Sequence, residues 1–87
     1  MTFGEAIAHV KNGKRITRKN WNGKNQFVFL IKGESLTDVV YNYTKEISNL
    51  IATDVLAIKT SNNQVQVGWL ATQTDMLCDD WCIVEED

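Results

Sequence analysis

A group of cations around one tryptophan is the part of the sequence best suited to binding a ligand. Trp21 lies in a polar, glycine-containing segment, and five basic residues stand near it: Lys14, Arg15, Arg18, Lys19 and Lys24. Cations bind phosphates, and an aromatic ring stacks on a nucleobase. Trp21 has no apolar sequence neighbours, so it is hard to bury in the protein's own core. The segment suits an anionic ligand that carries a base. Alternatively, Trp21 folds back to fill the core or packs in a subunit interface.

A second polar segment runs between two further tryptophans, Trp69 and Trp81. It contains hydroxyl, amide and carboxylate side chains at positions 72–75. Such groups commonly hold ribose hydroxyls and base edges. Trp81 precedes an apolar run and is expected in the core. Trp69 fits either a core anchor or a ligand contact.

Catalytic and metal-binding residues are poorly represented. The only histidine, His9, lies off the apolar stripe of its segment, which disfavours a Ser-His or Cys-His pair. Cys78 and Cys82 are expected to be free thiols in a reducing compartment. The acids within residues 75–80 could perform acid–base chemistry or hold a cation, but helix capping and a solvated turn explain them more simply. We therefore expect no enzyme, no catalytic residue, no metal and no cofactor.

The elements that position these residues begin with a helix. A capping box at Thr2 and Glu5 opens a helix over residues 3–11, which ends at Asn12-Gly13. Residues 14–32 predict a β-hairpin with Trp21 in its turn. Residues 55–69 predict a second hairpin, in which positions 64–69 alternate polar and apolar residues as a half-buried strand does.

The remaining segments complete an α+β architecture. Residues 34–53 are expected to form an irregular connection with short pieces of structure. Thr74 is expected to cap a short helical segment near 74–79, ahead of a last strand over 81–84. The predicted fold is an N-terminal helix packed on a mainly antiparallel sheet of two hairpins plus a C-terminal strand.

The size and charge of the chain restrict its function further. Its 87 residues allow a single domain, 1–87, with a thin core. The net charge of −2 combines +6 in residues 1–32 with −8 in residues 33–87. The acidic half argues against nucleic acid as a partner, although a small nucleic-acid-binding module using the Trp21 hairpin stays an alternative. With no long apolar run and no visible signal peptide, we expect no membrane association and a cytoplasmic setting.

Three segments of the sequence resemble one family, the small phage-encoded Thoeris anti-defence proteins of the second type. They are Phe3-Gly4-Glu5-Ala6 with Asn12-Gly13-Lys14, then Trp21-Asn22-Gly23-Lys24, and then residues 69–77 followed by Asp80-Trp81. The likeness covers about two thirds of the chain. It departs in residues 33–52 and just before Trp69, where family members often carry proline and this chain has none.

The resemblance implies a nucleotide sponge. Such proteins bind a signalling nucleotide derived from cyclic ADP-ribose, here glycocyclic ADP-ribose, which bacterial TIR enzymes make during infection. They hold it intact in the cytoplasm of the infected bacterium and so block Thoeris immunity. The resemblance also implies a homotetramer with pockets between protomers. A purely structural homo-oligomer stays an alternative.

The resemblance and the residue chemistry together give a set of expected ligand-binding residues. We expect Trp21 to stack on adenine, with Arg18 and Lys24 facing the pyrophosphate. Ribose or base edges would be held by Thr72, Gln73 and Asp75, from the same or the neighbouring protomer. The full set is Arg18, Trp21, Asn22, Lys24, Trp69, Thr72, Gln73, Thr74 and Asp75.

Overall fold

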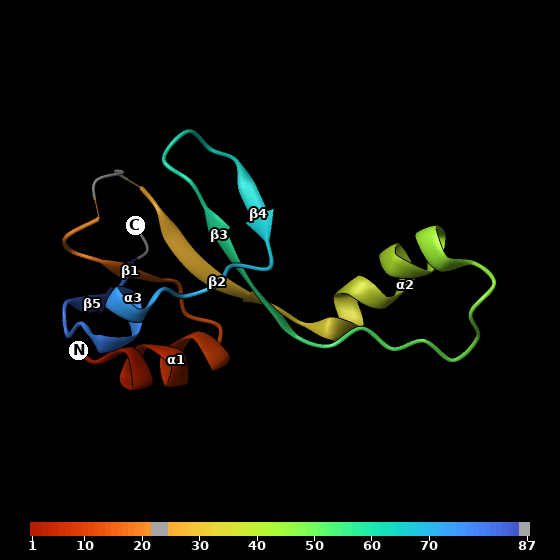
Figure 1. Cartoon of the computed structure of the whole chain (residues 1–87), viewed down its shortest axis with the longest axis horizontal. Coiled ribbons are helices and arrows are strands. Elements are labelled where there is room, and N and C mark those ends of the chain that lie inside the picture. The colour runs from red at the N-terminus through yellow and green to blue at the C-terminus, as the bar shows by residue number, and fades with distance from the viewer. Residues whose placement is uncertain (22–24, 86–87) are drawn as a thin grey trace.

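An antiparallel sheet forms the body of the molecule (Figure 1). The computed structural model describes residues 1–21 and 25–85. Within them the sheet has five strands in the order β4-β3-β2-β1-β5. The strands are β1 (Ile16–Arg18), β2 (Phe27–Ile31), β3 (Val55–Lys59), β4 (Val65–Val67) and β5 (Trp81–Ile83). Both predicted hairpins and the C-terminal strand are confirmed, and so is the α+β class. Pairing of β5 with β1 brings the second polar segment beside the Trp21 hairpin.

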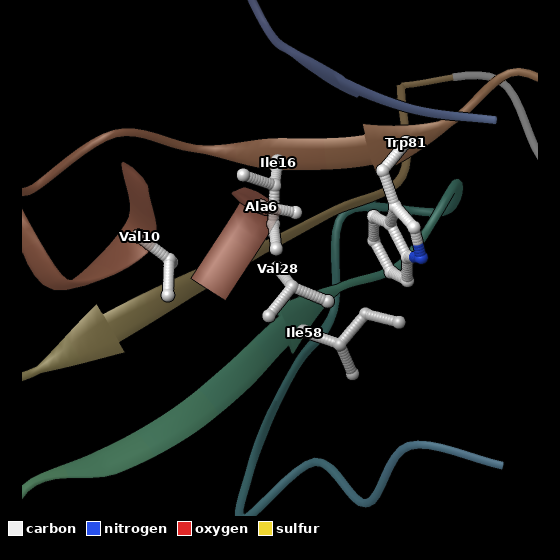
Figure 2. Packing of buried hydrophobic residues seen from close by; sticks show 6 residues of the cluster. All are labelled: Ala6, Val10, Ile16, Val28, Ile58 and Trp81. Carbon is white, nitrogen blue, oxygen red and sulfur yellow. The ribbon is translucent and has the colours of Figure 1, made fainter. Parts of the chain in front are cut away.

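Helix α1 (Phe3–Lys11) covers one face of this sheet and is confirmed as predicted. The Thr2 hydroxyl accepts from the Glu5 amide at 3.2 Å, and a Glu5 carboxylate oxygen accepts from the Thr2 amide at 2.9 Å. The chain leaves the helix through Gly13 at φ +88°, which suits glycine. Between α1 and the sheet lies the core that Figure 2 shows: Ala6, Val10, Ile16, Val28, Ile58 and Trp81.

The expected irregular connection over residues 34–53 is wrong in its first half, which forms helix α2 (Gly33–Thr44). The β-branched and tyrosine residues at 39–43 have strand propensity, which concealed the helix. Thr37 ties the helix to the returning chain, because its hydroxyl donates to the Gly33 carbonyl at 3.0 Å and accepts from the Ala52 amide at 3.2 Å. Helix α2 extends away from the sheet like an arm (Figure 1).

Two expectations about the second half of the chain need correction. The strand expected over 64–69 is shorter, and it is exposed rather than half-buried, because it is an edge strand whose valines do not belong to the core cluster. The short helix α3 (Gln73–Leu77) is present, but its cap is Thr72 rather than Thr74. The run Thr72-x-x-Asp75 is itself a capping box, which places the helix start. None of the helices in the described part of the chain is both long and apolar enough to cross a membrane.

Candidate functional site

Three tryptophans from distant parts of the sequence meet at one end of the sheet. The ring centroids lie 5.3 Å apart for Trp21 and Trp81, 6.2 Å for Trp69 and Trp81, and 6.3 Å for Trp21 and Trp69. All three pairs meet edge to face, a favourable arrangement for aromatic rings. We call these three residues the tryptophan cluster.

The members of the tryptophan cluster differ in burial. Trp81 is buried in the core, as predicted. Trp21 and Trp69 are half-buried and pack against the core cluster. Trp21 is expected to be hard to bury, with a core role as the alternative, and the structure buries it in part because Trp81 supplies the apolar surface that the sequence neighbours of Trp21 lack. Both half-buried indoles keep part of their surface at the solvent.

Backbone hydrogen bonds fix where each tryptophan stands. The Trp21 amide donates to the Arg18 carbonyl at 3.3 Å, which closes the turn after β1. The amides of Gly68 and Trp69 both donate to the Leu56 carbonyl at 2.8 Å. Gly68 has φ +93°, so this close double contact with β3 depends on a residue that tolerates the left-handed region.

The Arg18 side chain points into the protein rather than into solvent. Its Nη1 donates to Asp75 Oδ1 at 2.8 Å and its Nε to Asp80 Oδ1 at 2.9 Å. The third nitrogen, Nη2, lies 3.0 Å from the Cys78 sulfur. Only 9% of the side chain is exposed. The guanidinium, which is expected to face the pyrophosphate, is directed at three protein groups.

Asp75 is also engaged inside the protein. Its Oδ2 accepts from the Thr72 amide at 2.9 Å, while its backbone carbonyl accepts the Trp81 indole N–H at 2.8 Å. Burial raises the pKa of the Asp75 carboxyl, but hydrogen bonding with Thr72 and with the Arg18 guanidinium outweighs it and holds that pKa below its usual value. The Asp75 carboxylate is therefore ionised at neutral pH.

Asp80 is the second partner of Arg18. Its Oδ2 accepts from the Asn20 amide at 3.2 Å. The Arg18 guanidinium, more than the Asn20 amide, holds the pKa of the Asp80 carboxyl below its usual value. In turn, the hydrogen bond to Asp80 raises the pKa of Arg18 further above neutrality. All three groups carry full charge at neutral pH, so neither acid is suited to donate a proton in catalysis.

The remaining expected site residues lie around this network. Thr72 uses its hydroxyl to accept from the Asp75 amide at 3.1 Å, and it begins α3. Gln73 and Thr74 follow with exposed side chains. Asn22 and Lys24 lie outside the described residues. The structure thus brings the Trp21 turn and the 69–75 segment together. A pocket of about 460 Å³ opens near Thr17 and Phe27, and none of the expected site residues is among its described lining residues.

Comparison with known proteins identifies the family of the chain. A family model described as a Thoeris anti-defense 2-like domain matches residues 1–84. The chain is also 38% identical over 85 residues to Thoeris anti-defense 2 of Bacillus phage SP01, covering 97% of this chain and 94% of that protein. The chain belongs to the Thoeris anti-defence 2 family. This membership gives it an anti-Thoeris function and confirms the resemblance inferred from its motifs.

Within this Thoeris anti-defence 2 fold, two residues of the site were not predicted from the sequence. Asp80 and Cys78 complete the surroundings of Arg18, yet the acids at 75–80 read as a solvated turn and a cap. The missed signal was charge complementarity between these acids and the basic segment at 14–24. Their pairing joins residues 62 positions apart in the case of Arg18 and Asp80, which local spacing does not reveal.

Proposed function

We propose that this protein binds glycocyclic ADP-ribose made by bacterial TIR enzymes and sequesters it without cleaving it. The observation that carries the proposal is the contact between the half-buried Trp21 and Trp69 in a Thoeris anti-defence 2 chain. Both rings pack on Trp81, whose indole N–H binds the segment that carries the exposed Gln73 and Thr74. An indole face offers a stacking surface for adenine, and the amide and hydroxyl groups suit ribose and base edges. The proposed setting is the cytoplasm of the infected bacterium, where the signal is made.

Binding without turnover fits the chemistry of the described residues. The acids nearest the tryptophan cluster, Asp75 and Asp80, are committed to Arg18. A carboxylate whose pKa is lowered by such hydrogen bonds is a weak base. His9, the only histidine in the sequence, lies on α1 and not in the two segments that build the site. We therefore propose that the protein is not an enzyme and that retention of the intact nucleotide accounts for its anti-Thoeris function.

Tight retention is easier for an assembly than for one copy. A dissociation constant near 10 nM corresponds to about 11 kcal/mol, and ligands bound that tightly are usually enclosed on most sides. We propose a homotetramer in which the tryptophan cluster of one protomer is closed by a neighbour. Exposed apolar residues on and after α2 support association: Val39, Tyr41, Tyr43, Ile47 and Ile51.

A release assay tests the sequestration. The protein is mixed with the products of an active TIR enzyme, freed of small molecules by gel filtration and heated, and the supernatant is analysed by mass spectrometry. We expect unchanged glycocyclic ADP-ribose from the wild type and none when the TIR enzyme is inactive. A chemically altered nucleotide would identify an enzyme, and an empty supernatant would refute sequestration.

Substitutions at Trp21 connect the release assay to the site. Trp21→Ala removes the stacking surface and is expected to abolish retention, whereas Trp21→Phe keeps a ring and is expected to retain a measurable fraction. Each variant is also sized by light scattering. If Trp21→Ala dissociates the assembly and retention follows only the loss of assembly, the tryptophan is an interface anchor and the alternative of a structural homo-oligomer gains support.

The nucleic-acid alternative loses one of its main residues. Arg18, central in the basic segment, is neutralised by two carboxylates and is largely buried. Phosphate binding requires cations that can reach the backbone of the nucleic acid. Binding of labelled oligonucleotides that weakens steeply with added salt would nevertheless favour this alternative.

A further inference from the structure

We propose that Arg18 is a positioning residue: it holds Trp21 and the 72–75 segment in their binding arrangement and does not contact the nucleotide. This inference rests on the proposed function. It assigns to Arg18 a role different from the phosphate contact that its position in the basic segment suggests. The argument depends on where the three guanidinium nitrogens point and on what their partners hold in turn.

Arg18 stands at the junction of three segments. It ends β1, and its guanidinium reaches Asp75 on α3, Cys78 at the end of α3 and Asp80 just before β5. A guanidinium is planar and rigid, so three contacts in different directions fix the relative placement of the groups they join. One side chain thus links the Trp21 turn to the whole segment between α3 and β5.

On one side, the Asp80 contacts hold the chain that leads into Trp21. The Asp80 carboxylate accepts from the Asn20 amide at 3.2 Å, and the Asp80 carbonyl accepts from the Lys19 amide at 3.2 Å. The next residue, Trp21, donates its amide to the Arg18 carbonyl. The Trp21 indole then packs edge to face on Trp81. Loss of the Arg18–Asp80 bond would free the strand end that presents Trp21.

On the other side, the Asp75 contact holds the polar segment. Asp75 caps α3 together with Thr72, and its carbonyl receives the Trp81 indole N–H. Gln73 and Thr74, which we propose to contact the nucleotide, lie between these two capping residues. Rotation of Asp75 away from Arg18 would therefore move Gln73, Thr74 and the Trp81 contact together.

The burial of Arg18 and its partners indicates that a positive charge alone would not be enough for the positioning role at residue 18. The side chains of Arg18 and Asp75 are each 9% exposed and that of Asp80 is 15% exposed. Lysine keeps the positive charge but is a point donor without the planar fork, so it cannot reach two carboxylates and a sulfur in the same geometry. A phosphate contact made through charge would tolerate lysine, whereas positioning would not.

The deciding comparison is Arg18→Lys against Lys11→Met. Arg18→Lys keeps the net charge and removes the fork, while Lys11→Met removes a charge from an exposed residue of α1, outside the two segments that build the site. Near-ultraviolet circular dichroism of the ligand-free proteins reports the packing of the tryptophans, and calorimetric titration with glycocyclic ADP-ribose reports affinity. We expect an altered tryptophan spectrum and at least about tenfold weaker binding for Arg18→Lys, in line with the loss of a charged hydrogen bond. Lys11→Met should leave the spectrum unchanged and the affinity within about twofold of the wild type, as for an exposed side chain away from such features.

A stability-matched control separates positioning from general destabilisation. Val10→Ala opens a cavity in the core between α1 and the sheet and should lower the melting temperature. Measured at a temperature where every variant is folded, Val10→Ala is expected to bind normally with an unchanged tryptophan spectrum. Equal losses of binding in Val10→Ala and Arg18→Lys would overturn the proposal. If Arg18→Lys does not fold, Asp80→Asn, which keeps the size of the side chain, replaces it in the same comparison.

The remaining outcomes distinguish this inference from the proposed function. Weaker binding by Arg18→Lys with an unchanged ligand-free spectrum would mean direct contact with the nucleotide, and would overturn positioning. An unchanged spectrum together with unchanged binding would also overturn the positioning role of Arg18. If the wild type fails to bind glycocyclic ADP-ribose, the proposed function is refuted. In that case an altered spectrum for Arg18→Lys would still support the placement of the tryptophans by Arg18. An unaltered spectrum would overturn the positioning role as well as the proposed function.

Discussion

Asp75 shows how one residue can serve the fold and the candidate site together. Both carboxylate oxygens and the backbone carbonyl accept hydrogen bonds, and the residue is 7% exposed. A buried charge of this kind stabilises a protein only while its partners remain in place. The consequence is that substitution should affect stability and the tryptophan cluster at once.

We expect Asp75→Asn to lower the free energy of unfolding by about 2 kcal/mol, because a charged hydrogen bond to Arg18 is lost and the guanidinium keeps fewer acceptors. The neutral asparagine retains the size of the side chain. Asp79→Asn is the matched control, since Asp79 is a nearby exposed acid, and it should stay within about 0.5 kcal/mol of the wild type. Urea denaturation measures both, and equal stability of the two variants would contradict the importance of the Arg18 contact.

The lowered pKa values of Asp75 and Asp80 predict the direction of the pH dependence. Each folded-state pKa lies below the unfolded value of about 3.9, so the unfolded chain takes up protons first as the pH falls. Their stabilisation is complete above about pH 4 and is lost as the pH falls through the folded values. The urea midpoint of the wild type should therefore fall more steeply below about pH 4 than that of Asp75→Asn. Parallel acid limbs would refute this assignment.

For individual residues, the kinds of side chain at the site could be predicted from the sequence, but their pairing could not. Trp21, Trp69 and the polar run at 72–75 were recognisable from composition and motif. The contact of Arg18 with Asp75 spans 57 positions and depends on the β1–β5 pairing. Such a contact is set by topology, which the local pattern around residue 18 does not contain.

Among the elements, α2 is the one that the sequence concealed, whereas strong capping and alternation made α1 and the hairpins predictable. Its start depends on Gly33, which is buried and whose amide donates to Asp54 Oδ1 at 2.7 Å. A Cβ at Gly33 would overlap the Ala52 carbonyl oxygen. Glycine is required at position 33 because the segments that contain Gly33 and Ala52 pass close to each other. Such a close approach cannot be predicted from the spacing of apolar residues in the sequence.

Replacement of Gly33 by alanine should therefore displace the base of the arm despite the better helix propensity of alanine. We expect Gly33→Ala to lower the free energy of unfolding by about 2 kcal/mol through overpacking against backbone. Gly4→Ala is the control, because a Cβ there meets only the Thr2 hydroxyl oxygen at 4.0 Å, and it should be neutral or slightly stabilising. Thermal denaturation compares them, and an unaltered Gly33→Ala would show that the two segments can separate at little cost.

The molecule as a whole is elongated, with extents of 44 × 28 × 26 Å, because the α2 arm projects from the sheet (Figure 1). An isolated helix of this length is marginal in water. Helix α2 and the segment that follows it expose large apolar side chains, including Tyr43 on the helix at 87% and Ile51 after it at 81%. A second copy of the chain is the partner that would cover this surface in the proposed tetramer. The opposite net charges of residues 1–32 and 33–87 also favour contact between copies.

These two contributions to assembly respond differently to salt and to substitution. If the apolar residues on and after α2 hold the copies together, Ile51→Ser should shift the mass measured by light scattering toward smaller species, while Val65→Ser, at an exposed residue of the edge strand β4, should not. If attraction between the oppositely charged halves also contributes, raising the salt from about 0.05 to 0.5 M should weaken the wild-type assembly. The Debye length then shortens to about the distance between charges in contact, so their attraction is screened. Dissociation by Val65→Ser alone would place the contact on the edge strand β4 instead. A monomer under all conditions would refute the tetramer and require one copy to enclose the nucleotide alone.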